Sequence, residues 1–220
     1  GSNTLIRDGG IEGVTLKLSS KFSYIDLLND NSIKVGASTL DKKLAEFAFN
    51  NSISGFEFLS CIPGSIGGGI KMNSGCYGEE ISKILSSIEV MDLNGKIKEL
   101  EKEKINFSYR GCDLPNDLLI LSAKFKGNLS NKSDIQKKQI DLINRKKKSQ
   151  PTQVKTCGST FKNSKNKKAW ELIKNSGCDK IKVGQAQISE KHCNFFINNG
   201  KTNSSEIEEL INKVKKEVFN

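Results

Sequence analysis

The chain has 220 residues and a formal net charge of +10, from 35 lysine and arginine residues against 25 acidic ones. This length suits one large domain or two small ones and allows a sizeable core, which excludes disorder over the whole chain. No run of 18 apolar residues is present, which excludes a transmembrane helix, and no basic and then apolar leader opens the sequence. We therefore expect a globular protein with no membrane partner.

The positive charge comes almost entirely from lysine, because Arg7, Arg110 and Arg145 are the only arginines. A nucleic-acid partner is the weakest interpretation, since no aromatic residues interleave with the basic ones. Phosphate-bearing small ligands would use the same charge. The six cysteines form no CxxC pair and His192 is the only histidine, so we expect no metal site. Scattered cysteines in a chain of this length fit a reducing cytoplasm, where we expect the protein to reside.

The first elements in chain order are a strand and a helix. The alternation of Val14–Leu18 predicts a half-buried strand. Apolar residues on one face of Leu40–Phe49 predict a helix. Asp41 lies near the start of this helix, where the helix dipole favours a carboxylate.

A hairpin and a further strand follow. Residues 88–92 read as a strand, Asn94–Gly95 as a turn, and residues 96–100 as the returning strand. Residues 118–125 form another apolar strand. Strands alternating with a few helices give this first part an α+β character.

A charged stretch from residue 130 to 148 predicts a long helix with Ser133 as its N-cap. The basic run Arg145–Lys148 ends it, and we favour a solvated helix terminus for this run over a phosphate site. We place a domain boundary near residue 129, which divides the chain into residues 1–129 and 130–220.

The second part starts with a loop around Gly158. A helix over 169–175 and a strand around 195–197 follow. The last helix opens at Ser204, and its buried stripe consists of Ile207, Leu210, Ile211 and Val214.

Residues 62–78 are rich in glycine. Such a loop lets a ligand approach the backbone closely, and its free N–H groups can hold an anion. It lacks the Gly-Lys-Ser/Thr end of a P-loop and the strand and long helix of a dinucleotide fingerprint. Composition alone leaves two interpretations open, a phosphate or cofactor loop and a structural turn.

Five motifs occur in an order that resembles one enzyme family, the UDP-N-acetylmuramate dehydrogenases, also called UDP-N-acetylenolpyruvoylglucosamine reductases. The glycine-rich motif over 56–81 is similar to the flavin loop of that family. The other four motifs are Gly1–Asp8, Phe107–Arg110, Gln150–Pro151 with Cys157–Asn163, and Gln187–Phe195.

The resemblance implies an α+β fold with two domains. Residues 1–129 would form an FAD-binding lobe of the vanillyl-alcohol-oxidase type, and residues 130–220 a smaller α+β domain that binds a UDP-sugar. The implied reaction reduces UDP-N-acetylglucosamine enolpyruvate to UDP-N-acetylmuramate, a step of peptidoglycan precursor synthesis. FAD is the implied cofactor, NADPH the co-substrate, and the chain would act as a monomer in the cytoplasm without nucleic acid.

Three residues take catalytic roles under this resemblance. Arg110 would hold the substrate carboxylate as it becomes enolate-like, Ser159 would give the proton, and Glu190 would steady or protonate the same intermediate. Taken singly, each also has an ordinary interpretation: a surface cation, a turn cap and a solvated charge.

The binding residues follow from the same motifs. Tyr109, Lys162 and Asn163 would contact the substrate. The residues expected to hold FAD are Gly1, Ser2, Asn3, Pro63, Gly64, Ser65, Gly67, Gly68, Asn73, Gly75 and Gly78.

The chain departs from the family at three places. Ser149 stands where members often have a lysine, and no tyrosine follows Arg110, which implies the subtype without a tyrosine lid. Members also have an N-terminal segment before the Gly-Ser-Asn motif, so we expect the FAD lobe to be incomplete. The alternative function is a UDP-sugar-binding fragment without flavin or catalysis.

Overall fold

The computed structural model describes residues 1–219 and divides the chain into two compact units. One unit is Leu16–Arg145, and the other joins Gly1–Thr15 to the chain from Lys146 onward. The division falls inside helix α3 (Lys132–Ser149). The division into two functional domains, residues 1–129 and 130–220, remains a prediction. Each unit is described below by itself.

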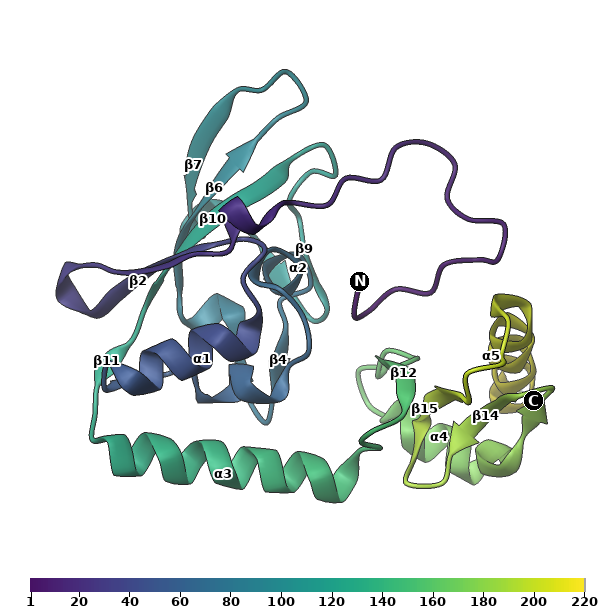
Figure 1. The fold of residues 1–220 in the computed structure, drawn as a ribbon. Coiled ribbons are helices and arrows are strands. Elements are labelled where there is room, and N and C mark those ends of the chain that lie inside the picture. Colours follow the sequence, from purple (N-terminus) through teal and green to yellow (C-terminus); the bar gives the residue numbers. More distant parts are fainter. Residues whose placement is uncertain (220) are drawn as a thin grey trace. The chain divides into compact units, whose positions relative to one another are not determined.

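A five-stranded antiparallel sheet forms the centre of the unit Leu16–Arg145 (Figure 1). Its order is β1 (Ile25–Leu27), β2 (Ser32–Gly36), β10 (Leu119–Lys126), β6 (Leu85–Met91) and β7 (Ile97–Glu101). Alternate residues of β2, β6 and β10 point into one core, which also takes the apolar faces of helices α1 (Asp41–Asn50) and α2 (Ile66–Lys71). The fully buried members include Ile33, Val35, Leu44, Ala48, Ile66, Ile70, Ile88, Val90 and Phe125.

The predictions for this sheet are confirmed. The expected helix is α1, and the expected hairpin is β6 and β7, with Gly95 at φ +81° in the turn. Short pairs complete the unit: β3 (Ile53–Ser54) with β11 (Asn128–Leu129), β4 (Gly75–Cys76) with β5 (Glu79–Glu80), and β8 (Phe107–Ser108) with β9 (Gly111–Cys112). Its 3₁₀ turns are Ser20–Phe22, Asn29–Asn31, Glu57–Cys61, Ile81–Lys83 and Lys102–Lys104.

The predicted strand over Val14–Leu18 is wrong, because these residues form no strand in the structure. The side chains of Val14 and Leu16 are 88% and 72% exposed. No described strand pairs with the segment, so its backbone N–H and C=O groups have no neighbouring strand to bond to.

Helix α3 confirms the charged helix, but not its predicted N-cap. The helix begins at Lys132, so Ser133 lies within its first turn. The carbonyl of Asn131 accepts the first N–H groups, from Asp134 at 3.0 Å and Ile135 at 3.2 Å. Ile135 and Leu142 are buried.

The other unit contains a four-stranded antiparallel sheet in the order β12 (Lys155–Ser159), β15 (His192–Asn198), β14 (Ala186–Ser189) and β13 (Lys182–Val183). Helices α4 (Ala169–Asn175) and α5 (Ser204–Phe219) share its core, and both match their predictions; a 3₁₀ turn spans Cys178–Lys180. The predicted loop around Gly158 is wrong. Gly158 lies within strand β12. The pairing of β12 with β15 is irregular between Thr156 and Ser159, and Gly158 has a φ of +81° there.

Residues 1–15 belong to this second unit through contacts with α5. The Asp8 carboxylate accepts the Ser204 N–H at 2.9 and 3.1 Å and its hydroxyl at 2.8 Å, while the Asp8 N–H donates to that hydroxyl at 2.8 Å. Arg7 pairs with Glu208 at 2.8 Å. A carboxylate at the first turn of α5 opposes the positive end of the helix dipole and caps it.

Candidate active site

The glycine-rich segment contains a short helix, α2, and two N–H groups at the start of this helix are already hydrogen-bonded. The N–H groups of Ile66 and Gly67 donate to the carbonyls of Thr39 and Ala37, both at 2.9 Å. Within residues 1–219, no backbone carbonyl accepts the N–H of Gly68. A phosphate or cofactor loop was one of the two interpretations left open by composition, and only a small part of the segment has backbone N–H groups free for that role.

The glycines of this segment separate into packed and open ones. A Cβ on Gly67 would lie 3.1 Å from that of Ala37, and one on Gly75 would lie 2.2 Å from the Glu79 carbonyl. At Gly78, which has a φ of +88°, a Cβ would meet nothing within 4 Å, and at Gly68 only the Ser65 hydroxyl at 3.7 Å. Gly67 and Gly75 are needed for close packing within the fold. At Gly68 and Gly78 the backbone is accessible, so a cofactor can approach it.

Asn73 is buried and uses both ends of its amide inside the protein. Its Nδ2 donates to the Ser108 carbonyl at 3.3 Å, and its Oδ1 accepts the Ser82 N–H at 3.1 Å. Its φ is +43°, a conformation that asparagine adopts more readily than most residues. The side chain thus joins the end of the glycine-rich segment to strand β8.

Arg110 occupies the turn between β8 and β9. Ser108 pairs with Gly111, so Tyr109 and Arg110 form the turn, and Arg110 has a φ of +58°. This conformation costs a non-glycine residue about 1 kcal/mol or more, and such strain gathers at functional sites. The guanidinium lies 5.8 Å from the ring centroid of Tyr109, which is 56% exposed.

Ser159 and Glu190 lie at the same end of the four-stranded sheet. Ser159 ends β12 and pairs with Phe195 of the antiparallel β15. Ser189 pairs with His192, so Glu190 is exposed in the tight turn that leads into β15. Both of these predicted catalytic residues therefore belong to one unit, whereas Arg110 belongs to the other unit.

Asn194 is a residue whose role the sequence did not reveal. It is buried, and its side chain accepts the Phe161 N–H at 2.8 Å and donates to the Phe161 carbonyl at 2.9 Å. Its own carbonyl accepts the Thr160 N–H at 2.8 Å. These bonds fix the chain directly after Ser159. A polar residue within the apolar strand run was the only signal for it.

The two predicted substrate residues after Ser159 differ in their surroundings. Lys162 is exposed. The Oδ1 atom of Asn163 accepts the Ala169 N–H at 2.9 Å and thereby helps to begin α4. Part of the Asn163 side chain is thus committed to the fold.

His192 packs as a neutral ring. Burial lowers its pKa, and its Nδ1 accepts the Asn194 N–H at 3.2 Å. The rings of Phe195 and Trp170 lie 4.9 and 6.4 Å away, centroid to centroid. This environment suits a structural histidine.

Asp41 contradicts the expectation of a favourable charge at the start of α1. Its side chain is fully buried, and within residues 1–219 neither carboxylate oxygen has a hydrogen-bond partner. Burial raises its pKa from 3.8 to about 7. The helix dipole contributes up to about 1 kcal/mol, which is less than the cost of removing a carboxylate from water.

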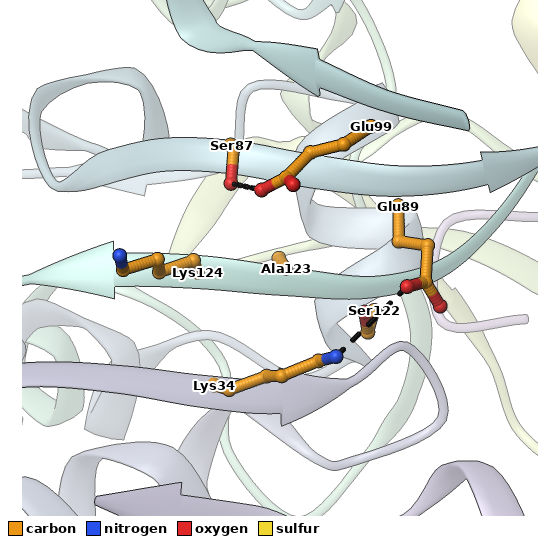
Figure 2. Close-up of a pocket in the computed structure, with 7 residues that line it drawn as sticks. All are labelled: Lys34, Ser87, Glu89, Glu99, Ser122, Ala123 and Lys124. Carbon is orange, nitrogen blue, oxygen red and sulfur yellow. Dashed lines mark hydrogen bonds and ion pairs between the residues drawn. The ribbon is translucent and has the colours of Figure 1, made fainter. Parts of the chain in front are cut away.

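A polar groove crosses the five-stranded sheet away from these residues (Figure 2). Two pairs of polar side chains lie along it: Lys34 lies 3.9 Å from Glu89, and the Ser87 hydroxyl donates to Glu99 at 2.5 Å. None of the predicted site residues lines it.

Residues 1–219 show neither a metal-binding cluster nor a membrane-spanning helix. No group of three or more His, Cys, Asp or Glu side chains there could hold a metal ion, and no two of the six cysteines form a disulfide. No helix among residues 1–219 is long and apolar enough to cross a bilayer.

Comparison with known proteins agrees with the positions of these motifs. A family described as FAD binding domain matches residues 1–101, and one described as UDP-N-acetylenolpyruvoylglucosamine reductase, C-terminal domain, matches residues 150–220. The matched domains and the α+β architecture define a flavoprotein oxidoreductase.

Individual relatives specify the family. A UDP-N-acetylenolpyruvoylglucosamine reductase of Pelagibacter ubique is 49% identical over 98% of this chain and 72% of its own length. One from Rickettsia bellii is 48% identical, over 100% of this chain and 72% of its own length. The crystal structure of the enzyme (MurB) from Thermus caldophilus superposes with a TM-score of 0.91 at 31% identity, covering 98% of this chain and 79% of that one. The chain belongs to the UDP-N-acetylenolpyruvoylglucosamine reductase family.

Proposed function

We propose that this chain carries out the family's reduction of UDP-N-acetylglucosamine enolpyruvate to UDP-N-acetylmuramate in peptidoglycan precursor synthesis. The observation that carries the proposal is the 49% identity to the Pelagibacter reductase across nearly the whole chain. Arg110, Ser159 and Glu190 stand in the motifs that define the family's catalytic residues, and each lies on a turn or at a strand end.

The residues of the glycine-rich segment fit a flavin. Gly68 and Gly78 leave their backbone open, and Pro63, Gly64 and Ser65 lead into the first turn of α2. Bound FAD would supply the hydride that adds to the enolpyruvyl carbon β to the carboxylate. Gly1, Ser2 and Asn3 are proposed to add contacts to the same cofactor, as are Gly67 and Gly75, and Asn73 through its backbone.

The remaining chemistry is assigned to side chains of this chain. The fork of N–H donors on Arg110 would bind the substrate carboxylate and stabilise the negative charge that develops on it. The Ser159 hydroxyl would protonate the α carbon, and Glu190 would hold that hydroxyl or the substrate in place. Tyr109, Lys162 and Asn163 are proposed to orient the UDP-sugar.

Several finer properties belong to the same proposal. NADPH would be the co-substrate, and the absence of tyrosine after Arg110 supports membership of the subtype without a tyrosine lid. The cysteines fit a cytoplasmic protein, and we propose that it acts as a monomer without nucleic acid or membrane partners. The division into an FAD domain, 1–129, and a substrate domain, 130–220, is part of this proposal.

The test separates the two half-reactions by stopped-flow absorbance of the flavin. FAD is titrated into the purified chain, NADPH reduces it, and the enolpyruvyl substrate then reoxidises it. Ser159→Ala is expected to slow reoxidation at least about 100-fold and to leave reduction by NADPH within about twofold. Thr160→Val, which replaces the neighbouring hydroxyl by a methyl group, is the matched control and is expected to leave both steps unchanged.

Two results would contradict the proposal. Equal slowing of both steps by Ser159→Ala would remove its role as proton donor. Binding of the UDP-sugar, measured by calorimetry, without any binding of FAD would favour the alternative of a sugar-binding protein without catalysis.

A further inference from the structure

Helix α2 and the turn that carries Arg110 are joined by two anchors. On the first strand of the hairpin, Asn73 Nδ2 donates to the Ser108 carbonyl at 3.3 Å. On the second strand, the Cys112 thiol donates to the Lys71 carbonyl at 3.5 Å. Lys71 and Asn73 are separated by a single residue, so one short stretch of chain holds both sides of the hairpin.

A further contact holds the chain beyond the hairpin. The Lys71 ammonium donates to the Leu114 carbonyl and, at 3.4 Å, to that of Pro115. The hairpin itself is very short, because β8 and β9 contribute only two pairs, Phe107 with Cys112 and Ser108 with Gly111. Two pairs of residues cannot fix a turn by themselves, so its geometry depends on these anchors.

Asn73 is the anchor nearest to Arg110. It is 6% exposed, and a buried amide held at both ends has one orientation. The Arg110 turn has a φ of +58°, which relaxes unless its surroundings maintain it. Ser108 directly precedes the turn. The bond between its carbonyl and Asn73 therefore fixes the peptide at the start of the turn and helps to hold Arg110 in its strained conformation.

We propose that Asn73 is a positioning residue for Arg110, linking the glycine-rich segment to the guanidinium rather than binding the cofactor through its side chain. The inference rests on the proposed function for the role of Arg110. It differs from the role expected for Asn73 from the sequence, in which the side chain is a flavin contact. Both ends of the amide are engaged in hydrogen bonds within the protein. A shift of the backbone after α2 on cofactor binding would therefore move the Arg110 turn through the side chain of Asn73.

Asn73→Asp separates the two bonds of the amide. Aspartate keeps an oxygen for the Ser82 N–H and tolerates the positive φ, but it has no N–H for the Ser108 carbonyl. Asn73→Gly is a second variant that removes both bonds without backbone strain, in case the buried charge prevents folding. Ser82→Ala is the matched control, because it removes the hydroxyl that donates to Glu80 at 2.5 Å and leaves the N–H that Asn73 accepts.

The first readout is amide hydrogen exchange of residues 107–112 in the 220-residue chain, which requires no activity. Exchange is expected to quicken about tenfold in Asn73→Asp and Asn73→Gly, and to change less than about twofold in Ser82→Ala. Unchanged exchange in both Asn73 variants would overturn the proposal. Loss of FAD affinity with unchanged exchange would overturn it in favour of a direct flavin contact.

The second readout is a double-mutant cycle on flavin reoxidation by the substrate. Asn73→Asp is expected to slow this step about tenfold with Arg110 present and not to slow it further in Arg110→Ala. Equal slowing in both backgrounds would overturn the proposal. If the unaltered chain shows no reductase activity, the proposed function fails, and the exchange experiment still decides whether Asn73 anchors the turn.

Discussion

Asp41 gives the sharpest prediction about stability. Its folded-state pKa of about 7, against 3.8, means that the folded chain binds a proton more tightly than the unfolded chain. The contribution of Asp41 to stability is therefore greatest below about pH 4 and is lost as the pH rises toward 7. The difference between the two pKa values corresponds to about 4 kcal/mol. Asp41→Asn cannot ionise and so avoids this loss.

The expected gain is smaller than the full figure. A buried amide adds an N–H pair that has no evident acceptor, since neither oxygen of Asp41 has a partner within residues 1–219. That costs about 1–2 kcal/mol. We expect Asp41→Asn to be more stable than the unaltered chain by about 2 kcal/mol at pH 8, with the difference disappearing or changing sign near pH 4.

The assay must report on the unit that contains Asp41. The only tryptophan, Trp170, belongs to the other unit, so urea unfolding is followed by far-ultraviolet circular dichroism and assigned by hydrogen exchange in β2 and β10. Asp26→Asn, at an exposed position in β1, is the control and should not alter the pH dependence. Parallel pH dependences for Asp41→Asn and the unaltered chain, or a less stable variant at pH 8, would refute the reasoning.

Three further predictions concern the site and its supports. Arg110→Gly should leave the thermal stability within about 1 kcal/mol, because glycine relieves the positive φ, while flavin reoxidation by substrate falls at least about 100-fold in stopped flow. Asp8→Ala removes the cap of α5 and should cost about 1–2 kcal/mol in unfolding followed by Trp170 fluorescence, whereas Arg7→Ala, which breaks an exposed ion pair, should cost less than about 1 kcal/mol. Asn194→Ala leaves the Phe161 N–H and carbonyl without their partner and should cost about 2–3 kcal/mol by the same assay.

Each has a result that would contradict it. A large loss of stability in Arg110→Gly would mean that the packing contacts of the arginine side chain outweigh the strain of its positive φ. Equal costs for Asp8→Ala and Arg7→Ala would mean that the cap is no stronger than a surface pair. An unchanged stability in Asn194→Ala would mean that water replaces its bonds.

Local pattern predicted the elements that bury a continuous apolar face. Leu40–Phe49 shows the stripe that α1 buries. Ile207, Leu210 and Val214 are the buried apolar residues of α5, whereas Ile211, which was predicted with them, is only partly buried. Each apolar side chain of such a stripe favours the same packing, so the period alone identifies the element.

The predictions failed where a partner distant in sequence decides the outcome. Val14–Leu18 has the alternation of a strand, but no described strand pairs with it. Asp41 looks like a surface carboxylate at a helix start, yet the packing of α1 against α2 places it inside the core, where a Cβ on Gly69 would lie 3.3 Å from its Oδ1. Neither result can be read from neighbouring residues.

In the candidate site, too, some residues could be predicted from the sequence and others could not. The motifs identified Arg110, Ser159 and Glu190 as residue types suited to the chemistry, and the sheet topology puts Ser159 and Glu190 toward the same end of the four-stranded sheet. The supporting bonds of Asn73 and Asn194 join residues 35 and 33 positions apart in the chain. Motif spacing carries no information about such contacts, so only the folded structure reveals them.

The bond between Asp8 and Ser204 has a consequence for biosynthesis. These residues are 196 positions apart, so α5 receives its cap from a segment that is made long before the helix itself. The unit that holds Ser159 and Glu190 cannot complete its folding until the residues of α5 have been made, and Asp8 must stay available until then. Contacts of such high sequence separation slow folding. A fragment that starts at Lys146 would contain the whole four-stranded sheet and still lack the cap of its last helix.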